Sequence, residues 1–304
     1  MMADLPDFAS RLTEQTRARG NPLCAGIDPH LDLIPALFRR GDMSDTAPAT
    51  AESLRDFCFE ILTRLHGKVP VIKPQAAMFE RLGPAGMSIL ADLSREAMAL
   101  GMLVIMDAKR GDIGSTSAAY AKGWLGHAAG FPSDALTVNP FLGLDTLKPF
   151  IDVADSTASG LFVLTRTSNP GSADIQGLEA RDGRPVFHHL ADGLRPLIEA
   201  HEGKSGFSSL GIVAGATWPE EAATLRRLLP SALFLVPGFG AQGGGREEAL
   251  AGLVEGPEGP EGGIVNTSRG ITFPAEAAEA RQLAGWRQAI DKAVDAAIRT
   301  IRGN

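Results

Sequence analysis

The sequence is poor in the residues that mark several classes of protein. Only two of its 304 residues are cysteines, Cys24 and Cys58, and neither lies in a CxxC or other metal-ligand spacing. We therefore expect reduced core thiols rather than a disulfide. The histidines also lack a ligand spacing near a carboxylate cluster, so we expect no metal site. They are His30, His66, His127, His188, His189 and His201.

Excess positive charge and long apolar runs are also missing. The formal net charge is −7, whereas a surface that neutralises a nucleic-acid backbone needs clustered Lys and Arg in excess. A small anionic ligand remains compatible with this charge, because it needs only a local positive site. No apolar run is long enough to span a bilayer, and the first twenty residues contain acids and no apolar stretch. We expect a cytoplasmic protein that binds neither nucleic acid nor membrane.

What the chain does contain is a regular alternation of two kinds of segment. Eight short apolar runs rich in β-branched residues predict strands at 22-28, 69-75, 102-109, 135-140, 161-166, 210-217, 232-238 and 262-268. Segments with helical spacing of apolar residues lie between them, for example at 52-66, 86-101, 116-130 and 219-230. The strands are too uniformly apolar to have one face in water. This pattern predicts a parallel sheet covered by helices.

Eight such units favour a closed (β/α)8 barrel, the TIM barrel of the α/β class, over a doubly wound open sheet. No Gly-x-Gly-x-x-Gly follows the first predicted strand. We expect residues 1-304 to form a single barrel domain, because barrels with insertions reach this length. Insertions are predicted near 167-205 and near 250-263. The second contains EGPEGPEGG (255-263), whose low complexity predicts a mobile surface loop.

Polar and charged residues collect where the predicted strands end, which is the active face of a barrel. They are Asp28, Lys73, Asp107, Lys109, Asn139, Thr165, Arg166, Thr217 and Arg269. Asp107 and Lys109 are two positions apart in MDAKRGDIGST (106-116), so on a strand they point to the same face, and Asp112 follows in the loop. One Asp–Lys pair is more often a structural salt bridge. The whole set indicates a functional cleft, because buried charges are costly unless they have a role.

Two Gly-rich turns, PGFGAQGGG (237-245) and NTSRGI (266-271), follow the last two predicted strands. The loops after these strands usually bind phosphate in this fold. Gln242 can donate an amide, and Arg269 offers a planar bidentate fork. Ordinary tight turns with one exposed arginine are the alternative. In TRTSNPG, Ser168 and Asn169 offer polar contacts above the fifth strand or, alternatively, cap a turn or helix.

These motifs resemble those of the orotidine 5'-phosphate decarboxylase family. MDAKRGDIGST is similar to its Asp-x-Lys-x-x-Asp signature, PGFGAQGG to its seventh-strand loop, and IVNTSRGI to its phosphate-gripping final loop. CAGIDP and VIKPQ fit the first-strand Asp and second-strand Lys, while VNPFLG and LTRTSNPGS resemble the longer bacterial branch. The resemblance implies a cofactor-free enzyme that makes uridine 5'-phosphate in de novo pyrimidine biosynthesis, as a homodimer with shared active sites.

The resemblance also implies catalytic roles. Lys109 would protonate carbon 6 of the pyrimidine, with Asp107 beside it. Asp112 would reach across the dimer interface into the partner's site, and Thr116 would accompany it to the ribose.

Binding roles are implied in the same way. Asp28 and Lys73 would hold ribose hydroxyls and complete the charged array. Gln242 and Arg269 would bind the 5'-phosphate, and Ser168 would contact the pyrimidine edge.

Two other interpretations stay open from the sequence. Metal-dependent sugar-acid phosphate decarboxylases of the same barrel use the corresponding acids to hold a divalent ion, although the DAKRGDIG context favours the cofactor-free enzyme. A catalytically silent phosphate-binding barrel would need neither Lys109 nor Asp112, and both are present.

Overall fold

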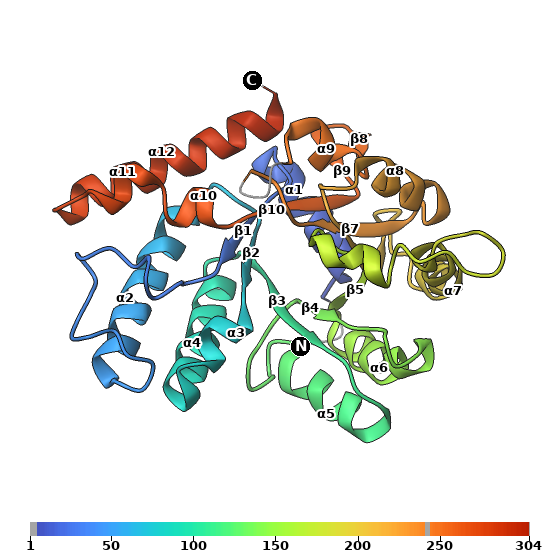
Figure 1. The fold of residues 1–304 in the computed structure, drawn as a ribbon, viewed down its shortest axis with the longest axis horizontal. Coiled ribbons are helices and arrows are strands. Elements are labelled where there is room, and N and C mark those ends of the chain that lie inside the picture. Colours follow the sequence, from blue (N-terminus) through green and yellow to red (C-terminus); the bar gives the residue numbers. More distant parts are fainter. Residues whose placement is uncertain (1–4, 241–243, 304) are drawn as a thin grey trace.

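The predicted barrel is confirmed in the computed structural model, which describes residues 5–240 and 244–303 (Figure 1). Eight parallel strands close in the order β1-β10-β7-β6-β5-β4-β3-β2. They are β1 (Leu23–Ile27), β2 (Val71–Pro74), β3 (Leu103–Arg110), β4 (Ala135–Val138), β5 (Gly160–Arg166), β6 (Ser208–Ala214), β7 (Ala232–Val236) and β10 (Gly263–Thr267). The ends of each strand lie within two residues of the predicted ends, except that β6 ends three residues earlier than predicted.

Helices surround the strands on the outside of the barrel. The longer ones are α2 (Pro48–Leu65), α4 (Gly83–Ala99), α5 (Gly114–Trp124), α6 (Lys148–Thr157), α7 (Val186–Ala200), α8 (Pro219–Leu228) and α12 (Leu283–Arg302). Shorter helices are α3 (Ala76–Glu80), α9 (Arg246–Leu250), α10 (Arg269–Thr272) and α11 (Ala275–Ala278). The predicted helix at 116-130 ends early, as α5, because Leu125 is extended and Gly126 adopts a φ of 86°.

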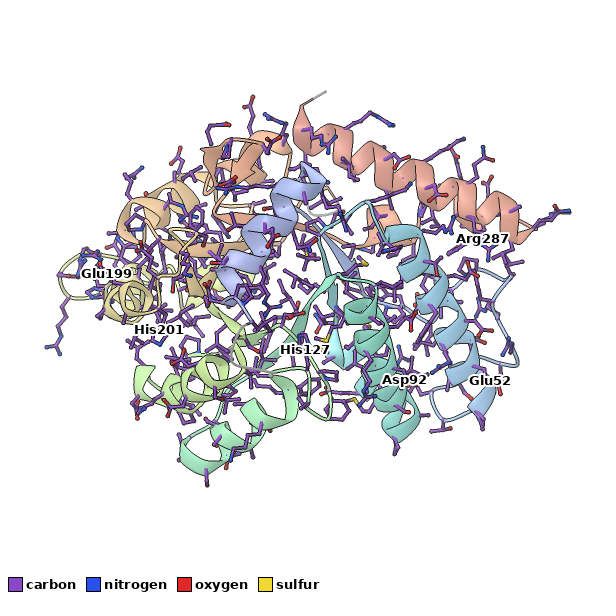
Figure 2. The ribbon with its side chains drawn as sticks, turned by 180° about the vertical axis from the view of Figure 1, so that it is seen from behind. Glu52, Asp92, His127, Glu199, His201 and Arg287 are labelled. Carbon is purple, nitrogen blue, oxygen red and sulfur yellow. The ribbon has the colours of Figure 1, made fainter. Side chains whose placement is uncertain are left out.

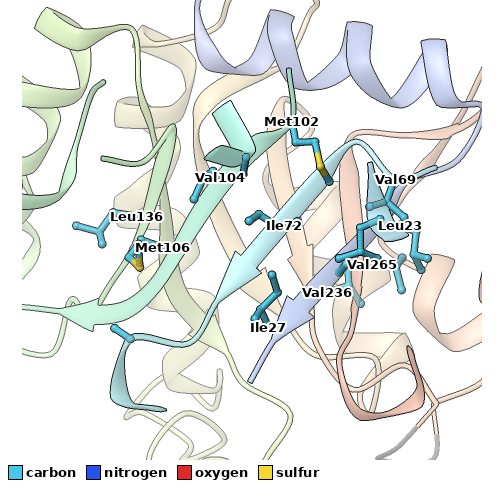
Figure 3. Packing of buried hydrophobic residues seen from close by; sticks show 14 of the residues in the cluster. Leu23, Ile27, Val69, Ile72, Met102, Val104, Met106, Leu136, Val236 and Val265 are labelled. Carbon is cyan, nitrogen blue, oxygen red and sulfur yellow. The ribbon is translucent and has the colours of Figure 1, made fainter. Parts of the chain in front are cut away.

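Alternate strand residues are buried on opposite faces of the sheet. One set, which includes Leu23, Ile72 and Val265, packs between the strands and the helices (Figure 3). The other set, which includes Ile105 and Phe162, fills the inside of the barrel. Both faces are therefore apolar, which explains why the strands appear in the sequence as continuous apolar runs.

Helix α1 (Phe8–Arg19) closes the N-terminal end of the barrel, as the view from behind shows (Figure 2). Phe8 packs edge-on against Phe162 inside the barrel, with ring centroids 6.0 Å apart. Gly160 makes this possible, because a Cβ there would lie 2.2 Å from the Phe8 ring. The closure leaves the opposite, C-terminal end of the barrel for a ligand.

The segment expected to be a mobile loop at 255-263 is instead largely an antiparallel hairpin, formed by β8 (Val254–Gly256) and β9 (Gly259–Glu261). Glu261 is buried and accepts hydrogen bonds from Arg17 Nε and Nη2 at 2.6 and 2.8 Å. Gly259 provides the turn with a φ of 121°. The expectation was wrong because composition does not show this ion pair with α1.

Candidate active site

A cavity of about 1320 Å³ opens at the C-terminal end of the barrel. Its floor is built from pairs of inward-facing residues two positions apart near the strand ends, although β3 is irregular there, since its register with β4 shifts between Met106 and Arg110. Three neighbouring strands and their ends contribute Lys73 with Gln75, Asp107 with Lys109, and Thr137 with Asn139. Polar side chains thus replace apolar ones on the inner face where the strands end.

Asp107 lies between two lysines at the floor of this cavity. Lys73 Nζ donates a hydrogen bond to Asp107 Oδ2 at 2.6 Å, and Lys109 Nζ donates one to Oδ1 at 2.6 Å. Gln75 Nε2 donates to Oδ2 at 3.3 Å, and Thr137 Oγ1 lies 3.1 Å from Oδ1. With partners on both oxygens, the Asp107 carboxylate holds one orientation and fixes both ammonium groups.

The two lysines differ in exposure. Lys73 is 4% exposed, whereas the side chain of Lys109 is 47% exposed. Lys109 also has a φ of 48°, and its backbone N–H donates to Thr137 Oγ1 at 2.9 Å. A non-glycine residue in this region costs about 1–3 kcal/mol and typically marks a functional position. Lys109 is therefore the lysine that remains available to a ligand.

Electrostatics keep the buried pair ionised. Burial by itself would raise the pKa of Asp107, but the charges of Lys73 and Lys109 outweigh it and hold the pKa well below its usual range. Burial would likewise lower the pKa of Lys73, but Asp107 and Asp28 raise it above its usual value. The cavity floor consequently carries fixed charges of both signs at neutral pH.

Two buried acceptors on the cavity wall lack a hydrogen-bond partner among the residues that the structure describes. They are Oδ1 of Asp28 and Oδ1 of Asn266, at the ends of the neighbouring strands β1 and β10. Gly26 lies beside them, where a Cβ would come within 1.9 Å of Ser268 Oγ. Because buried polar atoms are normally paired, this wall is suited to a ligand that brings hydroxyl donors.

Most of the predicted site residues meet in this cavity. Six of them line it: Asp28, Lys73, Asp107, Lys109, Ser168 and Arg269. Within the described part of the chain, Asp112 and Thr116 do not line it. They lie in the loop after β3 and in the first turn of α5, where Asp112 Oδ1 accepts from the N–H of Ile113 at 2.7 Å. Gln242 lies outside the described residues.

Several lining residues were not singled out from the sequence, among them the strand-end residues Gln75, Thr137 and Asn266. Each is a polar residue two positions from an inward-facing residue that lies in the same strand or directly after it. Thr137, for example, is two positions before Asn139. The two-residue period of a strand could have identified them as inward-facing. They were missed because site residues were sought only after the end of each strand.

Neither a metal cluster nor a membrane span stands out in residues 5–240 and 244–303. These ranges contain no group of three or more His, Cys, Asp or Glu side chains that could hold a metal ion. No helix in them is long and apolar enough to cross a membrane.

A closed parallel barrel whose C-terminal mouth holds a Lys–Asp–Lys array defines a barrel enzyme with a charged active-site cleft. Comparison with known proteins identifies its family. Residues 21–283 match the model of the orotidine 5'-phosphate decarboxylase / HUMPS family. The chain belongs to this family.

Individual relatives are similar in sequence over nearly the whole length of this chain. The chain is 40% identical over 290 residues to the orotidine 5'-phosphate decarboxylase of Rhodopirellula baltica, covering 93% of this chain and 95% of that one. It is 40% identical over 271 residues to that of Deinococcus radiodurans, covering 88% and 90%. A crystal structure of the putative enzyme from Streptomyces avermitilis is 35% identical with a TM-score of 0.78, covering 99% and 97%.

Proposed function

We propose that this protein decarboxylates orotidine 5'-phosphate to uridine 5'-phosphate and carbon dioxide in pyrimidine biosynthesis. The observation that carries the proposal is the Asp107 carboxylate fixed at 2.6 Å between Lys73 and Lys109 on the floor of a large cavity. Membership of the family and the relatives' names support the same activity.

The reaction explains why the site needs a fixed cation. Breaking the bond between carbon 6 and the carboxylate leaves an electron pair on carbon 6, with no adjacent carbonyl to delocalise it. A preorganised ammonium group stabilises that charge and then donates its proton to the same carbon. Lys109 suits this role because it is charged, half exposed and held by Asp107. The proton then replaces carbon dioxide on the ring, and Lys109 regains one from solvent.

The other polar groups of the cavity support binding roles for the ribose and phosphate. Asp28 and Lys73 hold the ribose hydroxyls in this proposal, which fits the unpaired buried Oδ1 of Asp28. Arg269, the first residue of α10, binds the 5'-phosphate together with Gln242 in this proposal, and Ser168 contacts the pyrimidine edge. Arg269 and Ser168 line the same cavity, which supports their joint action on one ligand.

A homodimer with shared active sites is also part of the proposal. Asp112 and Thr116 are directed to the partner's site in this arrangement. Large apolar side chains nearby support a covering surface: Ile113, Phe141 and Leu142 are 61%, 74% and 56% exposed. Such a group of exposed apolar residues is typical of an interaction surface.

We further propose a cytoplasmic location. Cys24 and Cys58 are both buried and free, which fits a reducing compartment.

The activity is tested by following uridine 5'-phosphate formation from orotidine 5'-phosphate with purified, chelator-treated protein. We expect full turnover without added metal. Turnover that requires magnesium, or is confined to sugar-acid phosphates, would instead favour the metal-dependent decarboxylases of the same fold.

A further inference from the structure

We propose that Arg166 is a positioning residue that holds the segment 167–176 over the cavity, so that Ser168 can meet the pyrimidine. This inference rests on the proposed function. The segment follows β5 and supplies several lining residues of the cavity, among them Ser168, Asn169 and Gln176. Arg166, the last residue of β5, does not line the cavity within the described part of the chain.

A bulge in β5 turns Arg166 away from the cavity. Leu164 pairs with Val213, whereas Arg166 pairs with Ala214, so one extra residue is inserted in β5 between the two pairs. Leu164 and Val213 face the cavity, and Ala214 belongs to the cluster between the sheet and the helices. Without the bulge, Arg166 would share the face of Leu164 and point into the cavity. The bulge directs it toward α8 instead.

The guanidinium of Arg166 joins the end of β5 to the segment 167–176 and to the N-terminal end of α8. Its Nε and Nη2 donate to the carboxylate of Glu221 in α8, and its Nη1 donates to Ser172 Oγ inside the segment. Its Cζ also lies 4.1 Å from the centroid of the Trp218 ring. A planar fork is required for these contacts at once, and a lysine ammonium cannot make them together.

Burial shows that this arrangement is specific. Arg166 is 3% exposed, and a buried charge is costly unless it is paired and hydrogen-bonded. Glu221 neutralises the charge, and Trp218 covers one face of the fork. Every nitrogen of the guanidinium is thereby engaged, so Arg166 serves the segment rather than a ligand.

Trp218 and its neighbours hold the backbone of the segment directly. Trp218 Nε1 donates to the carbonyl of Thr167 at 3.1 Å, and Thr217 Oγ1 donates to that of Ser168 at 3.2 Å. A Cβ on Gly215 would lie 2.8 Å from Ser168 Cα, so only glycine lets the backbone approach so closely. Arg166 orients Trp218, and Trp218 in turn fixes the residue before Ser168.

The contacts of Arg166 should affect recognition of the base alone. Arg269, the proposed phosphate ligand, lies after β10, in a different part of the barrel mouth. Loss of the Arg166 contacts should therefore weaken binding of a pyrimidine nucleotide and leave binding of a sugar phosphate unchanged. A general loss of stability would affect both ligands.

The experiment compares binding of uridine 5'-phosphate and ribose 5-phosphate to the full chain by calorimetry. We expect Arg166→Gln to weaken uridine 5'-phosphate binding about 10-fold or more, the size of one lost charge-assisted hydrogen bond. Ribose 5-phosphate binding should stay within about twofold. Arg166→Lys should recover only part of the loss. Trp218→Phe keeps the stacking surface and removes one hydrogen bond, so it should show a smaller loss of the same kind even if Arg166→Gln folds poorly.

Arg226→Gln is the matched control. Arg226 is also stacked on an aromatic ring, 4.0 Å from the centroid of Phe234, but it donates to backbone carbonyls such as those of Gly252 and Gly262, away from the cavity. It should lower stability and leave the ratio of the two affinities unchanged. An unchanged ratio in both Arg166→Gln and Trp218→Phe would overturn the inference. Wild-type protein that binds ribose 5-phosphate but not uridine 5'-phosphate would overturn the proposed function and, with it, this inference.

Discussion

At the scale of single residues, the two lysines of the active site have different roles because they differ in burial. Lys73 and Lys109 both donate to Asp107 at 2.6 Å, but only Lys109 is substantially exposed. Lys73 and Asp107 therefore form the fixed part of the array, and Lys109 forms the part that faces the reacting carbon in the proposed reaction.

Asp107→Asn should destabilise the protein by about 3–5 kcal/mol, because it leaves Lys73 buried without its counter-charge. The folded-state pKa of Asp107 is lowered. Its stabilising contribution is thus present above the unfolded carboxyl pKa, near 4, and is lost as the pH falls through the lower folded value. Urea unfolding at several pH values should show a flatter acid dependence for the variant.

The control is Asp152→Asn, since Asp152 pairs with Lys148 on an exposed helix face at 2.8 Å. It should change the free energy of unfolding by less than about 0.5 kcal/mol. Equal effects of the two variants would contradict the structural role of Asp107.

The phosphate site gives a second prediction at this scale. Arg269→Ala should lower kcat/KM for orotidine 5'-phosphate by about 10- to 150-fold, the value of a charge-assisted contact of about 1.5–3 kcal/mol. Orotidine, which lacks the phosphate, should be turned over far more slowly by wild-type protein, because phosphate binding energy helps to order the site. The arginine variant should slow orotidine little further. Steady-state assays with both substrates check this, and equal turnover of the two by wild type would refute it.

At the scale of elements, the strands were more predictable than the loops. Each strand is a short apolar run bounded by polar or Gly/Pro residues, and that signal is local. The hairpin at 254–261 pairs its own two strands and binds Arg17 through Glu261, a contact 244 residues distant in the sequence that composition does not reveal. Arg166 was placed with the active face for a similar reason: a one-residue bulge in β5 reverses its direction, and nothing in the local sequence marks the bulge.

The site residues also divide into those with a local sequence signal and those that depend on the folded barrel. Asp107 and Lys109 could be found from their spacing and from the family signature. Thr137 and Asn266 lie within apolar strands and are recognised only when the inward face is known. The cavity and the contacts of Asp107 could not be predicted from the sequence, because they depend on how the closed barrel brings neighbouring strands together.

Helix α1 provides a prediction about stability alone. Arg11 pairs with Asp134, which also accepts from the N–H of Val104 at 2.9 Å. Asp134→Ala should cost about 3–5 kcal/mol, because a buried ion pair loses one partner, with kcat unchanged because the pair lies at the closed end of the barrel. Thermal unfolding and a kinetic assay at a permissive temperature measure both. Asp155→Ala, at a largely exposed carboxylate, is the control and should change neither.

At the scale of the whole molecule, the proposed shared site predicts complementation. Lys109→Ala and Asp112→Ala homodimers should each be inactive. A mixed dimer contains one site with both residues intact, and random exchange makes half of the dimers mixed, so activity should recover to about a quarter of wild type. Subunits exchanged under mild denaturant and then assayed check this. No recovery, despite mixed dimers detected by mass, would contradict the shared site.

Metal-free decarboxylation by Lys109 is tested by the loss of orotidine 5'-phosphate absorbance with chelator-treated wild-type protein and with Lys109→Ala, beside Lys148→Ala as a surface control. We expect rapid metal-free decay in the wild type and the control. The rate should fall about 100-fold or more for Lys109→Ala, because this variant lacks both the stabilising charge and the proton donor. Decay that is equally fast in Lys109→Ala, or absent from wild type until magnesium is added, would contradict metal-free decarboxylation by Lys109.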